Sequence, residues 1–255
     1  MNKLKKGEYM DFNFKGRWLS EFGGYVGSTD GGFRTFSLLP SRSYVTEKPL
    51  GSNKTIVFAS SLDPRSIVIP IVFEDMSEIG LRDIAAWLDS PEPSPLYFKD
   101  EDIAIDCVLD SQAFDIETIG GIDGITEIKF IANDPIFYSM KENKTTLTNV
   151  KTTQKYTIKN QSTYEIFPTI EVSCNGQLTI AIYDKNDKIC STSIITDITS
   201  GVIIDCLNLD CTTLSGAPWF DKIDTFPSLP IGDFKIMFAG SNITNAVITF
   251  KEQYI

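Results

Sequence analysis

Short apolar runs separated by turn residues dominate the pattern of this chain. Glycine, proline, asparagine and aspartate recur about every eight to twelve residues, and the runs between them are rich in valine, isoleucine, threonine, phenylalanine and tyrosine. The clearest runs in the first half are 55–60 (TIVFAS) and 66–75 (SIVIPIVFED). No internal repeat or low-complexity tract interrupts the pattern. The sequence therefore predicts a mostly antiparallel β protein.

One segment has the period of a helix instead. It is predicted to begin near Asp75 or Ser77, which are good capping residues, and to end before three closely spaced prolines, Pro91, Pro93 and Pro95. Its apolar stripe consists of Leu81, Ile84, Ala85 and Leu88. Trp87 lies just off this stripe and is expected to pack at the helix edge. We expect this helix to cover one face of a sheet.

The strand that follows, 96–110, carries aspartates at even spacing. Asp102, Asp106 and Asp110 share one face with Ala104 and Val108, whereas Ile103, Ile105, Cys107 and Leu109 face the other way. Such a stripe has two interpretations, a carboxylate active site or a solvated face. The strand rise separates these aspartates by about 7 to 14 Å, while glycosidase pairs need about 5 to 9.5 Å across a cleft. The spacing favours the solvated face.

A polar segment from Ser139 to about Lys151 divides the chain. Lysine, asparagine and threonine dominate it, which is typical of a linker. We therefore predict a first domain at 1–140, a linker at 141–151 and a second domain at 152–255. The second domain contains further strand patterns and no second helix of comparable strength, so it is expected to be an all-β sandwich or jelly roll.

Composition limits the possible functions. The 255 residues are 42% hydrophobic and 22% charged, as in globular proteins, and the formal net charge is −11. An acidic chain is poorly suited to wrapping nucleic acid, because phosphate neutralisation requires an excess of lysine and arginine. The basic start lacks a following apolar stretch, so no signal peptide is predicted. No apolar run reaches the length of a membrane span.

The absence of histidine removes the commonest general base and metal ligand. The five cysteines, Cys107, Cys174, Cys190, Cys206 and Cys211, form no C-x-x-C pair and are odd in number, so neither a zinc site nor a closed disulfide framework is predicted. Apolar or β-forming neighbours indicate that Cys107, Cys190 and Cys206 are buried thiols. Folding in a reducing cytoplasm is expected.

Two further segments resemble ligand-binding motifs but lack the residue pattern that each motif requires. The glycines at 23–24, 27 and 31–32 do not form G-x-G-x-x-G, so flexible turns are predicted rather than a phosphate loop. The stretch 183–190 (YDKNDKIC) has Lys188 and Ile189 at the fifth and sixth positions of an EF-hand loop, so it is predicted to be a hairpin turn. No catalytic, cofactor-binding or metal-binding residue is assigned.

The three tryptophans leave two possibilities open. Trp18, Trp87 and Trp219 could stack on sugars, although such residues more often fill cores or interfaces.

The order of several segments resembles a known family. These segments are 11–26 (DFNFKGRWLSEFGGYV), 85–102 (AAWLDSPEPSPLYFKDED), 128–139 (IKFIANDPIFYS) and 226–255. In the last of them, a turn with proline and glycine leads into the final two strand patterns of the chain. Together they resemble the distal tail proteins of long-tailed (siphovirus) bacteriophages, from about Asp11 to Ile255. Two departures are Asp233, where the family more often has asparagine, and the residues before Met10, which have no counterpart.

This resemblance implies a structural virion protein. An N-terminal β-sandwich domain would form a homo-hexameric ring, with an extended arm, for which 40–55 is the candidate, clasping the neighbouring subunit. The C-terminal domain would be a galectin-like β-sandwich. The ring would join the tail tube protein to the tail-tip protein, carry receptor-binding proteins and let DNA pass. The protein would be made in the bacterial cytoplasm, with no enzymatic activity, cofactor, metal or membrane contact.

Two alternatives and one hypothesis accompany this interpretation. The alternatives are a carbohydrate-binding module that recognises cell-wall glycans through Trp219, and a carboxylate glycosidase suggested by the acidic residues. The hypothesis is that part of the negative charge faces the bore of the ring, with Asp102, Asp106 and Asp110 as contributors, and repels the DNA that passes.

Overall fold

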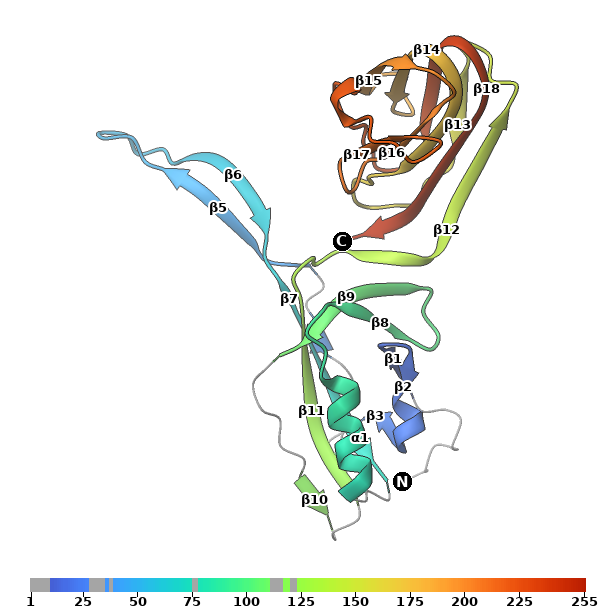
Figure 1. Cartoon of the computed structure of the whole chain (residues 1–255). Coiled ribbons are helices and arrows are strands. Elements are labelled where there is room, and N and C mark those ends of the chain that lie inside the picture. Colours follow the sequence, from blue (N-terminus) through green and yellow to red (C-terminus); the bar gives the residue numbers. More distant parts are fainter. Residues whose placement is uncertain (1–9, 28–34, 37–38, 75–77, 111–116, 120–122) are drawn as a thin grey trace. The chain divides into compact units, whose positions relative to one another are not determined.

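The structure is a computed structural model that describes residues 10–27, 35–36, 39–74, 78–110, 117–119 and 123–255. The chain forms two compact units, Met1–Phe137 with Ile255 and Tyr138–Tyr254 (Figure 1). Strands dominate both units, and the described residues contain one α-helix, so the predicted mostly β fold with a single covering helix is confirmed. Among the described residues, no helix has the length and apolar character that crossing a bilayer requires.

The first unit is built from antiparallel strand pairs. Its strands are β1 (Phe12–Phe14), β2 (Arg17–Trp18), β3 (Gly24–Val26), β4 (Thr35–Phe36), β5 (Arg42–Glu47), β6 (Ile56–Leu62), β7 (Arg65–Phe73), β8 (Ser94–Phe98), β9 (Ile103–Leu109), β10 (Glu117–Ile119) and β11 (Asp123–Ala132). Strand β11 pairs with β7, β9 and β10, β7 also pairs with β3 and β4, and β8 lies between β1 and β9. The core gathers apolar side chains from β1, β7, β8, β9 and β11.

Helix α1 (Glu78–Leu88) covers this core, as predicted, although its predicted start at 75–77 lies outside the described residues. Ile84, Trp87 and Leu88 are buried, whereas Ala85 is exposed and Leu81 is 37% exposed. The predicted stripe was therefore wrong by about one position, and Trp87 belongs to the core. The indole stacks on Phe22 at a centroid distance of 4.5 Å, because the short 3₁₀ turn Leu19–Phe22 presents that ring to the helix.

Strands β5 and β6 pair only with each other in the described structure and form a hairpin that projects from the first unit (Figure 1). We call this hairpin, residues 42–62, the arm. It contains most of the segment 40–55 that was predicted to be an extended arm. The strand pattern at 55–60 is confirmed as the start of β6, but none of its side chains is buried.

The second unit is an all-β sandwich, as predicted. Its strands are β12 (Phe137–Thr148), which begins at the boundary, β13 (Lys155–Ile158), β14 (Thr169–Tyr183), β15 (Ile189–Ile198), β16 (Val202–Asp205), β17 (Asp210–Thr213) and β18 (Phe234–Tyr254), with a 3₁₀ turn at Phe220–Lys222. The first part of β14 pairs with β16 and its last part with β15, while β18 pairs along both parts. Register shifts around Asn175 and Gly176 allow these long strands to bend around one core.

Two other features differ from the sequence-based expectations. The segment expected to be a linker, 141–151, lies largely within β12, where Asn143, Thr145 and Leu147 alternate with more exposed neighbours. A polar strand with one partly covered face has little hydrophobic contrast, so composition hides it. Cys190 is exposed rather than buried, because it stands at the start of β15 beside a turn. The other four cysteines are buried and free.

Candidate interaction surface

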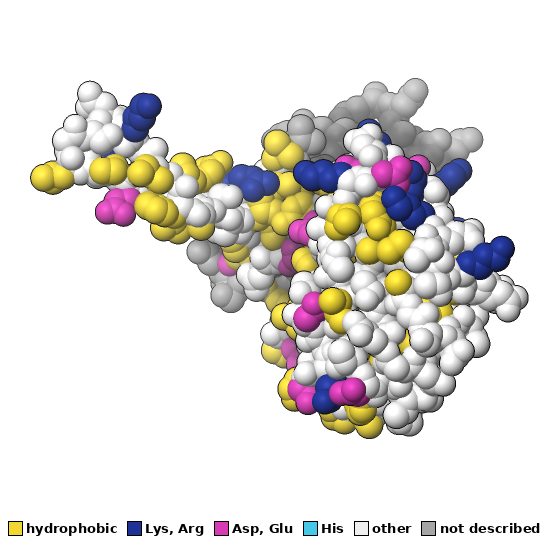
Figure 2. All heavy atoms as spheres, turned by 90° about the horizontal axis from the view of Figure 1, so that it is seen from above, with side chains coloured by type: hydrophobic (Ala, Val, Ile, Leu, Met, Phe, Trp, Pro, Cys, Tyr) yellow, Lys and Arg dark blue, Asp and Glu magenta, His cyan; other side chains and the backbone are white. Residues whose placement is uncertain are grey.

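The arm exposes large apolar side chains to solvent. In β5, Tyr44 is 58% and Val45 is 63% exposed, and in β6, Val57 is 57% and Phe58 is 61% exposed. Figure 2 shows hydrophobic side chains along the arm, which extends to the left as in Figure 1. An isolated two-stranded hairpin is at best marginally stable in water, and contiguous exposed apolar surface usually marks an interaction site. The arm therefore has the properties of a contact surface.

Both faces of the arm carry this apolar surface. Tyr44 and Val45 are consecutive in β5, so their side chains point to opposite faces. The pairs Val45–Ala59 and Thr46–Val57 leave Phe58 as an extra residue in β6, which is a β-bulge. All residues of β5, and all residues of β6 except Leu62, are exposed in the described structure. A partner can therefore contact the arm from either side.

The tip of the arm is ordered and basic. The amide of Ser52 donates to the carbonyl oxygen of Pro49 at 3.0 Å, and the amide of Lys54 donates to the Ser52 hydroxyl at 3.0 Å. Leu50 is fully exposed between Lys48 and Lys54. From 42 to 54 the arm contains three basic residues and one acidic residue, in a chain whose formal net charge is −11. The tip is therefore a preformed, positively charged and apolar projection.

The aspartate stripe of β9 is not a cluster of free carboxylates. Asp106 in β9 and Asp102, just before this strand, are exposed, as the solvated interpretation predicted. The Asp110 carboxylate instead lies 2.8 Å from the ammonium group of Lys129, with only 12% of its side chain exposed. Among the described residues, no group of three acidic or cysteine side chains is arranged to hold a metal ion. This geometry offers no paired acid and base across a cleft.

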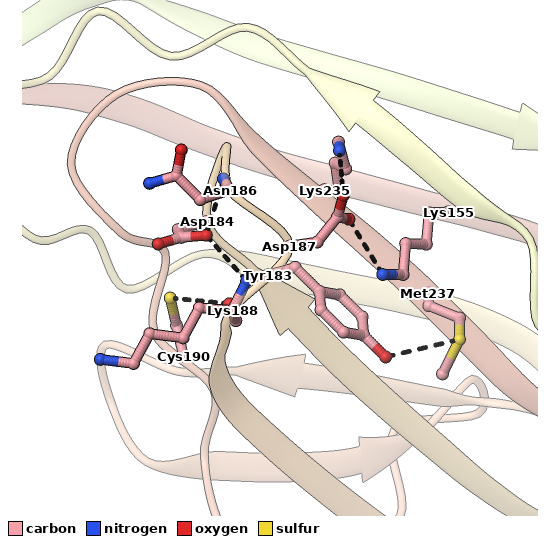
Figure 3. Close-up of polar contacts among 9 residues, drawn as sticks. All are labelled: Lys155, Tyr183, Asp184, Asn186, Asp187, Lys188, Cys190, Lys235 and Met237. Carbon is pink, nitrogen blue, oxygen red and sulfur yellow. Dashed lines mark hydrogen bonds and ion pairs between the residues drawn. The ribbon is translucent and has the colours of Figure 1, made fainter.

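A polar network in the second unit is structural. Asp187 accepts hydrogen bonds from the ammonium groups of Lys155 and Lys235, both at 2.9 Å, and these bonds lower the carboxyl pKa (Figure 3). Lys155 also lies over the Tyr183 ring, 3.9 Å from its centroid. The carboxylate of Asp184 accepts the amide of Lys188 at 2.9 Å, which confirms the predicted hairpin turn. All these groups have partners, and the network joins β13, β14 and β18.

The three tryptophans serve packing. Trp87 is 3% exposed, and its indole nitrogen donates to the carbonyl oxygen of Phe14 at 2.7 Å. Trp219 packs against the core of the second unit and donates to the carbonyl oxygen of Thr196 at 3.1 Å. Trp18 is half-buried and meets Tyr97 edge to face. Trp219 is therefore engaged in the packing of the second unit.

A depression of about 220 Å³ beside α1 is lined in part by Lys15 and Arg17, and both of these cations already have partners. Lys15 donates to the carbonyl oxygen of Asp89 at 2.7 Å, and Arg17 pairs with Glu21 at 3.2 Å while it lies over the Phe22 ring. These contacts connect the β1–β2 turn to the end of the helix. The charged side chains at this depression therefore have a structural role.

Comparison with known proteins agrees with this fold. Residues 23–132 match the family model of the phage tail protein RIFT-related domain. The search of curated proteins finds no significant match. The resemblance to distal tail proteins of long-tailed phages is confirmed by this domain together with the structural match that follows.

One similar solved structure is the Dit (gp 19.1) protein of phage SPP1, described as a paradigm of the hub adsorption apparatus of phages that infect Gram-positive bacteria. The TM-score is 0.75 at 15% identity, over 97% of this chain and 100% of that chain, which shows a shared fold. A chain of the phage p2 baseplate in its activated, strontium-bound conformation matches at a TM-score of 0.47 and 11% identity, covering 95% of this chain and 98% of that chain. That score is too low to support an argument.

Proposed function

We propose that this chain, which contains a phage tail protein RIFT-related domain, is a distal tail protein of a long-tailed bacteriophage. Six copies form a ring through the first unit, residues 1–140, and the second unit, 152–255, is a galectin-like sandwich around that ring. The ring joins the tail tube protein to the tail-tip protein and supports receptor-binding proteins. The protein is made in the cytoplasm of the host bacterium and functions in the virion.

The arm is the observation that carries this proposal. A hairpin with apolar residues such as Val45 and Phe58 exposed gains stability when a partner covers it. A contact from the arm of one copy to a different surface of the next copy is heterologous, and repetition of such a contact closes a ring when the rotation allows. The geometry of the arm therefore suits assembly of identical subunits around an axis.

The proposed role does not include catalysis. The chain has no histidine, and Asp110 and Asp187 form ion pairs with Lys129 and Lys155. The acidic charge of the ring would limit adhesion of DNA during its passage, because like charges repel. The protein would thus act through its shape and its contacts.

The experiment compares the purified wild-type chain with an arm-deleted variant. In the variant, residues 43–61 are replaced by an Asn-Gly turn, because Arg42 and Leu62 are Cα partners at the base of the hairpin and this dipeptide closes a two-residue turn. Light scattering after size-exclusion chromatography is expected to give a wild-type mass near six times 28.4 kDa, and negative-stain images should show rings. The deleted variant is expected to be a folded monomer.

A pair of single substitutions distinguishes loss of the contact between subunits from loss of folding. Phe58→Ser removes one exposed ring from the arm, whereas Leu207→Ser removes a side chain of similar exposure, 64%, from the second unit. We expect Phe58→Ser to weaken the ring and Leu207→Ser to leave it intact, with unchanged melting curves in both. A wild-type chain that stays monomeric at every concentration, or rings that survive deletion of the arm, would contradict the proposal.

A further inference from the structure

Arg65 is a buried charge at the root of the arm. It is the first residue of β7, three positions after the end of β6, and its backbone pairs with Ala132 of β11 (Figure 1). Only 2% of the residue is exposed. The central carbon of its guanidinium lies over the Phe137 ring, 4.8 Å from the ring centroid, within the first unit. An ionised side chain is therefore held against an aromatic ring and shielded from solvent.

One edge of this guanidinium has no partner in the described structure. Both Nε and Nη2 are buried, and neither donates a hydrogen bond to any described residue. Their N–H groups point to the same side of the planar group, which is an edge that arginine uses to hold an anion with two bonds. Native structures leave few buried polar atoms unpaired, and a charged donor without a partner costs more than a neutral one. The edge therefore indicates a missing ligand.

The acidic residues closest to Arg65 along the chain and across the strand pair do not supply the missing charge. The carboxylate of Asp63 accepts the Ser43 hydroxyl at 2.6 Å, and that of Asp134 accepts the Ile136 amide at 3.2 Å. Neither carboxylate bonds to Nε or Nη2. An internal ion pair between these aspartates and the buried edge is therefore not the way in which this chain neutralises Arg65.

Loss of a proton does not relieve this burial either. Desolvation lowers the pKa of Arg65, but the guanidinium keeps its proton at neutral pH because its ordinary pKa lies far above that range. A buried charge without a counter-charge is strongly destabilising, and contact with a ring face offsets only part of that cost. A bound anion remains as the source of neutralising charge.

We propose that the Nε–Nη2 edge of Arg65 binds a monatomic halide anion such as chloride. A single halide accepts both N–H donors at once, so it needs no further donors at an enclosed position. The oxygens of phosphate or sulfate that point away from the edge would need donors of their own. By neutralising Arg65, the ion would stabilise the packing of the first residue of β7 on Phe137, the first residue of β12. This inference goes beyond the proposed function and does not depend on it.

The first test measures the melting temperature by calorimetry in sodium chloride, sodium bromide and sodium gluconate at one ionic strength. Gluconate is too large for an enclosed site. Chloride and bromide should therefore raise the melting temperature of the wild type above its value in gluconate by at least about 3 °C, and the gain should grow with halide concentration, because a ligand that binds only the folded chain stabilises it. Arg65→Met and Arg65→Gln, which remove the buried charge, should lose this gain.

The control has the same change in net charge at an exposed position. Arg82→Met alters an exposed arginine of α1 and should keep the full gain, so a general effect of these salts on the chain is measured separately. The second test is crystallographic. Wild-type crystals soaked in bromide should show anomalous scattering within hydrogen-bond distance of Nε and Nη2 of Arg65, and crystals of Arg65→Gln should not. Circular dichroism of every variant shows whether it is folded.

Each outcome supports or overturns the halide site. A halide gain in the wild type and Arg82→Met that both Arg65 variants lack, together with bromide at the edge, supports it. Equal gains in all four chains, or no gain in the wild type, would overturn it. An ordered water at the edge in place of bromide would also overturn it, because water would then satisfy the two donors without a counter-charge. Ring assembly does not enter these measurements, so failure of either proposal leaves the other intact.

Discussion

The indole nitrogen of Trp87 donates a hydrogen bond to the carbonyl oxygen of Phe14 at 2.7 Å, between residues 73 positions apart in the chain. This bond joins α1 to β1. The same indole stacks on Phe12 and Phe22 at centroid distances of 5.7 and 4.5 Å. One side chain therefore connects the helix both to the backbone and to the aromatic core of the first unit.

Substitution of Trp87 is expected to separate these two contributions. Trp87→Phe keeps an aromatic ring but leaves the Phe14 carbonyl without its donor, and should lower the free energy of unfolding by about 1 to 3 kcal/mol. Trp87→Ala also creates a cavity and should cost about 3 to 5 kcal/mol. Urea denaturation followed by circular dichroism measures both. As a control, Phe220→Ala, at a side chain 62% exposed, should change the value by less than about 0.5 kcal/mol. A Trp87→Phe variant as stable as the wild type would argue against the hydrogen bond, and equal costs for Phe and Ala would argue against the packing contribution.

Two glycines provide a matched test of backbone conformation. Gly201 has φ +136°, and a Cβ there would lie 2.5 Å from the carbonyl oxygen of Val172. Gly216 has φ +86° with open space around it. Gly216→Ala should cost about 1 to 2 kcal/mol through strain alone, and Gly201→Ala should cost at least about 3 kcal/mol because strain and a clash combine. Thermal unfolding of the two variants measures both losses of stability. A larger loss for Gly216→Ala than for Gly201→Ala would refute the prediction.

Thiol labelling should detect one cysteine in the folded chain. Cys190 is exposed, whereas burial raises the pKa of Cys174 and Cys211 to about 11 and that of Cys206 to about 12. A thiol reacts as its thiolate, so buried thiols with raised pKa values are slow. With an aromatic disulfide reagent at pH 8, we expect one rapid equivalent, lost in Cys190→Ser, and five equivalents in denaturant. More than one rapid equivalent in the folded wild type would contradict the buried placement.

The same thiols predict a loss of stability in alkali. A thiol is neutral when protonated, and its ordinary pKa is 9.0, so above pH 9 the unfolded chain releases protons that the folded chain retains at Cys206 until about pH 12. Folding stability should therefore fall as the pH rises through this window, by on the order of 1 to 2 kcal/mol for Cys206 by pH 10.5. Denaturation at pH 8 and 10.5 measures it. Cys206→Ala should show a smaller loss than Cys190→Ser, and identical losses would exclude this cause.

Local patterns predicted the strands and the helix but not which surfaces would be covered. The run 55–60 has the composition of a core strand, and it forms β6, yet Val57 and Phe58 are more than half exposed. Burial depends on whether another element packs on the strand, and no nearby residue encodes that. Trp87 was expected at the helix edge because the apolar period alone placed the stripe, whereas the facing rings of Phe12 and Phe22 determine its position.

The interaction surface was partly foreseen. The resemblance identified 40–55 as an arm, and its charges could be read directly. The edge-to-face contact between Trp18 and Tyr97 could not, because the strand register joins residues from distant parts of the chain. The aspartates of β9 were correctly interpreted as a solvated face, except that Asp110 pairs with Lys129 from the neighbouring strand.

The bulge at Phe58 and the proline at position 49 have a consequence for the newly made chain. A flat ribbon with two unpaired edges would recruit strands from any nearby polypeptide and form aggregates. Local twisting at the bulge, an imino acid that cannot donate, and lysines at positions 48 and 54 each discourage such indiscriminate pairing. In the proposed assembly, these devices would keep the hairpin available until a correctly shaped neighbour arrives, and the same twenty-one residues, 42–62, would then limit aggregation before assembly and provide the contact after it.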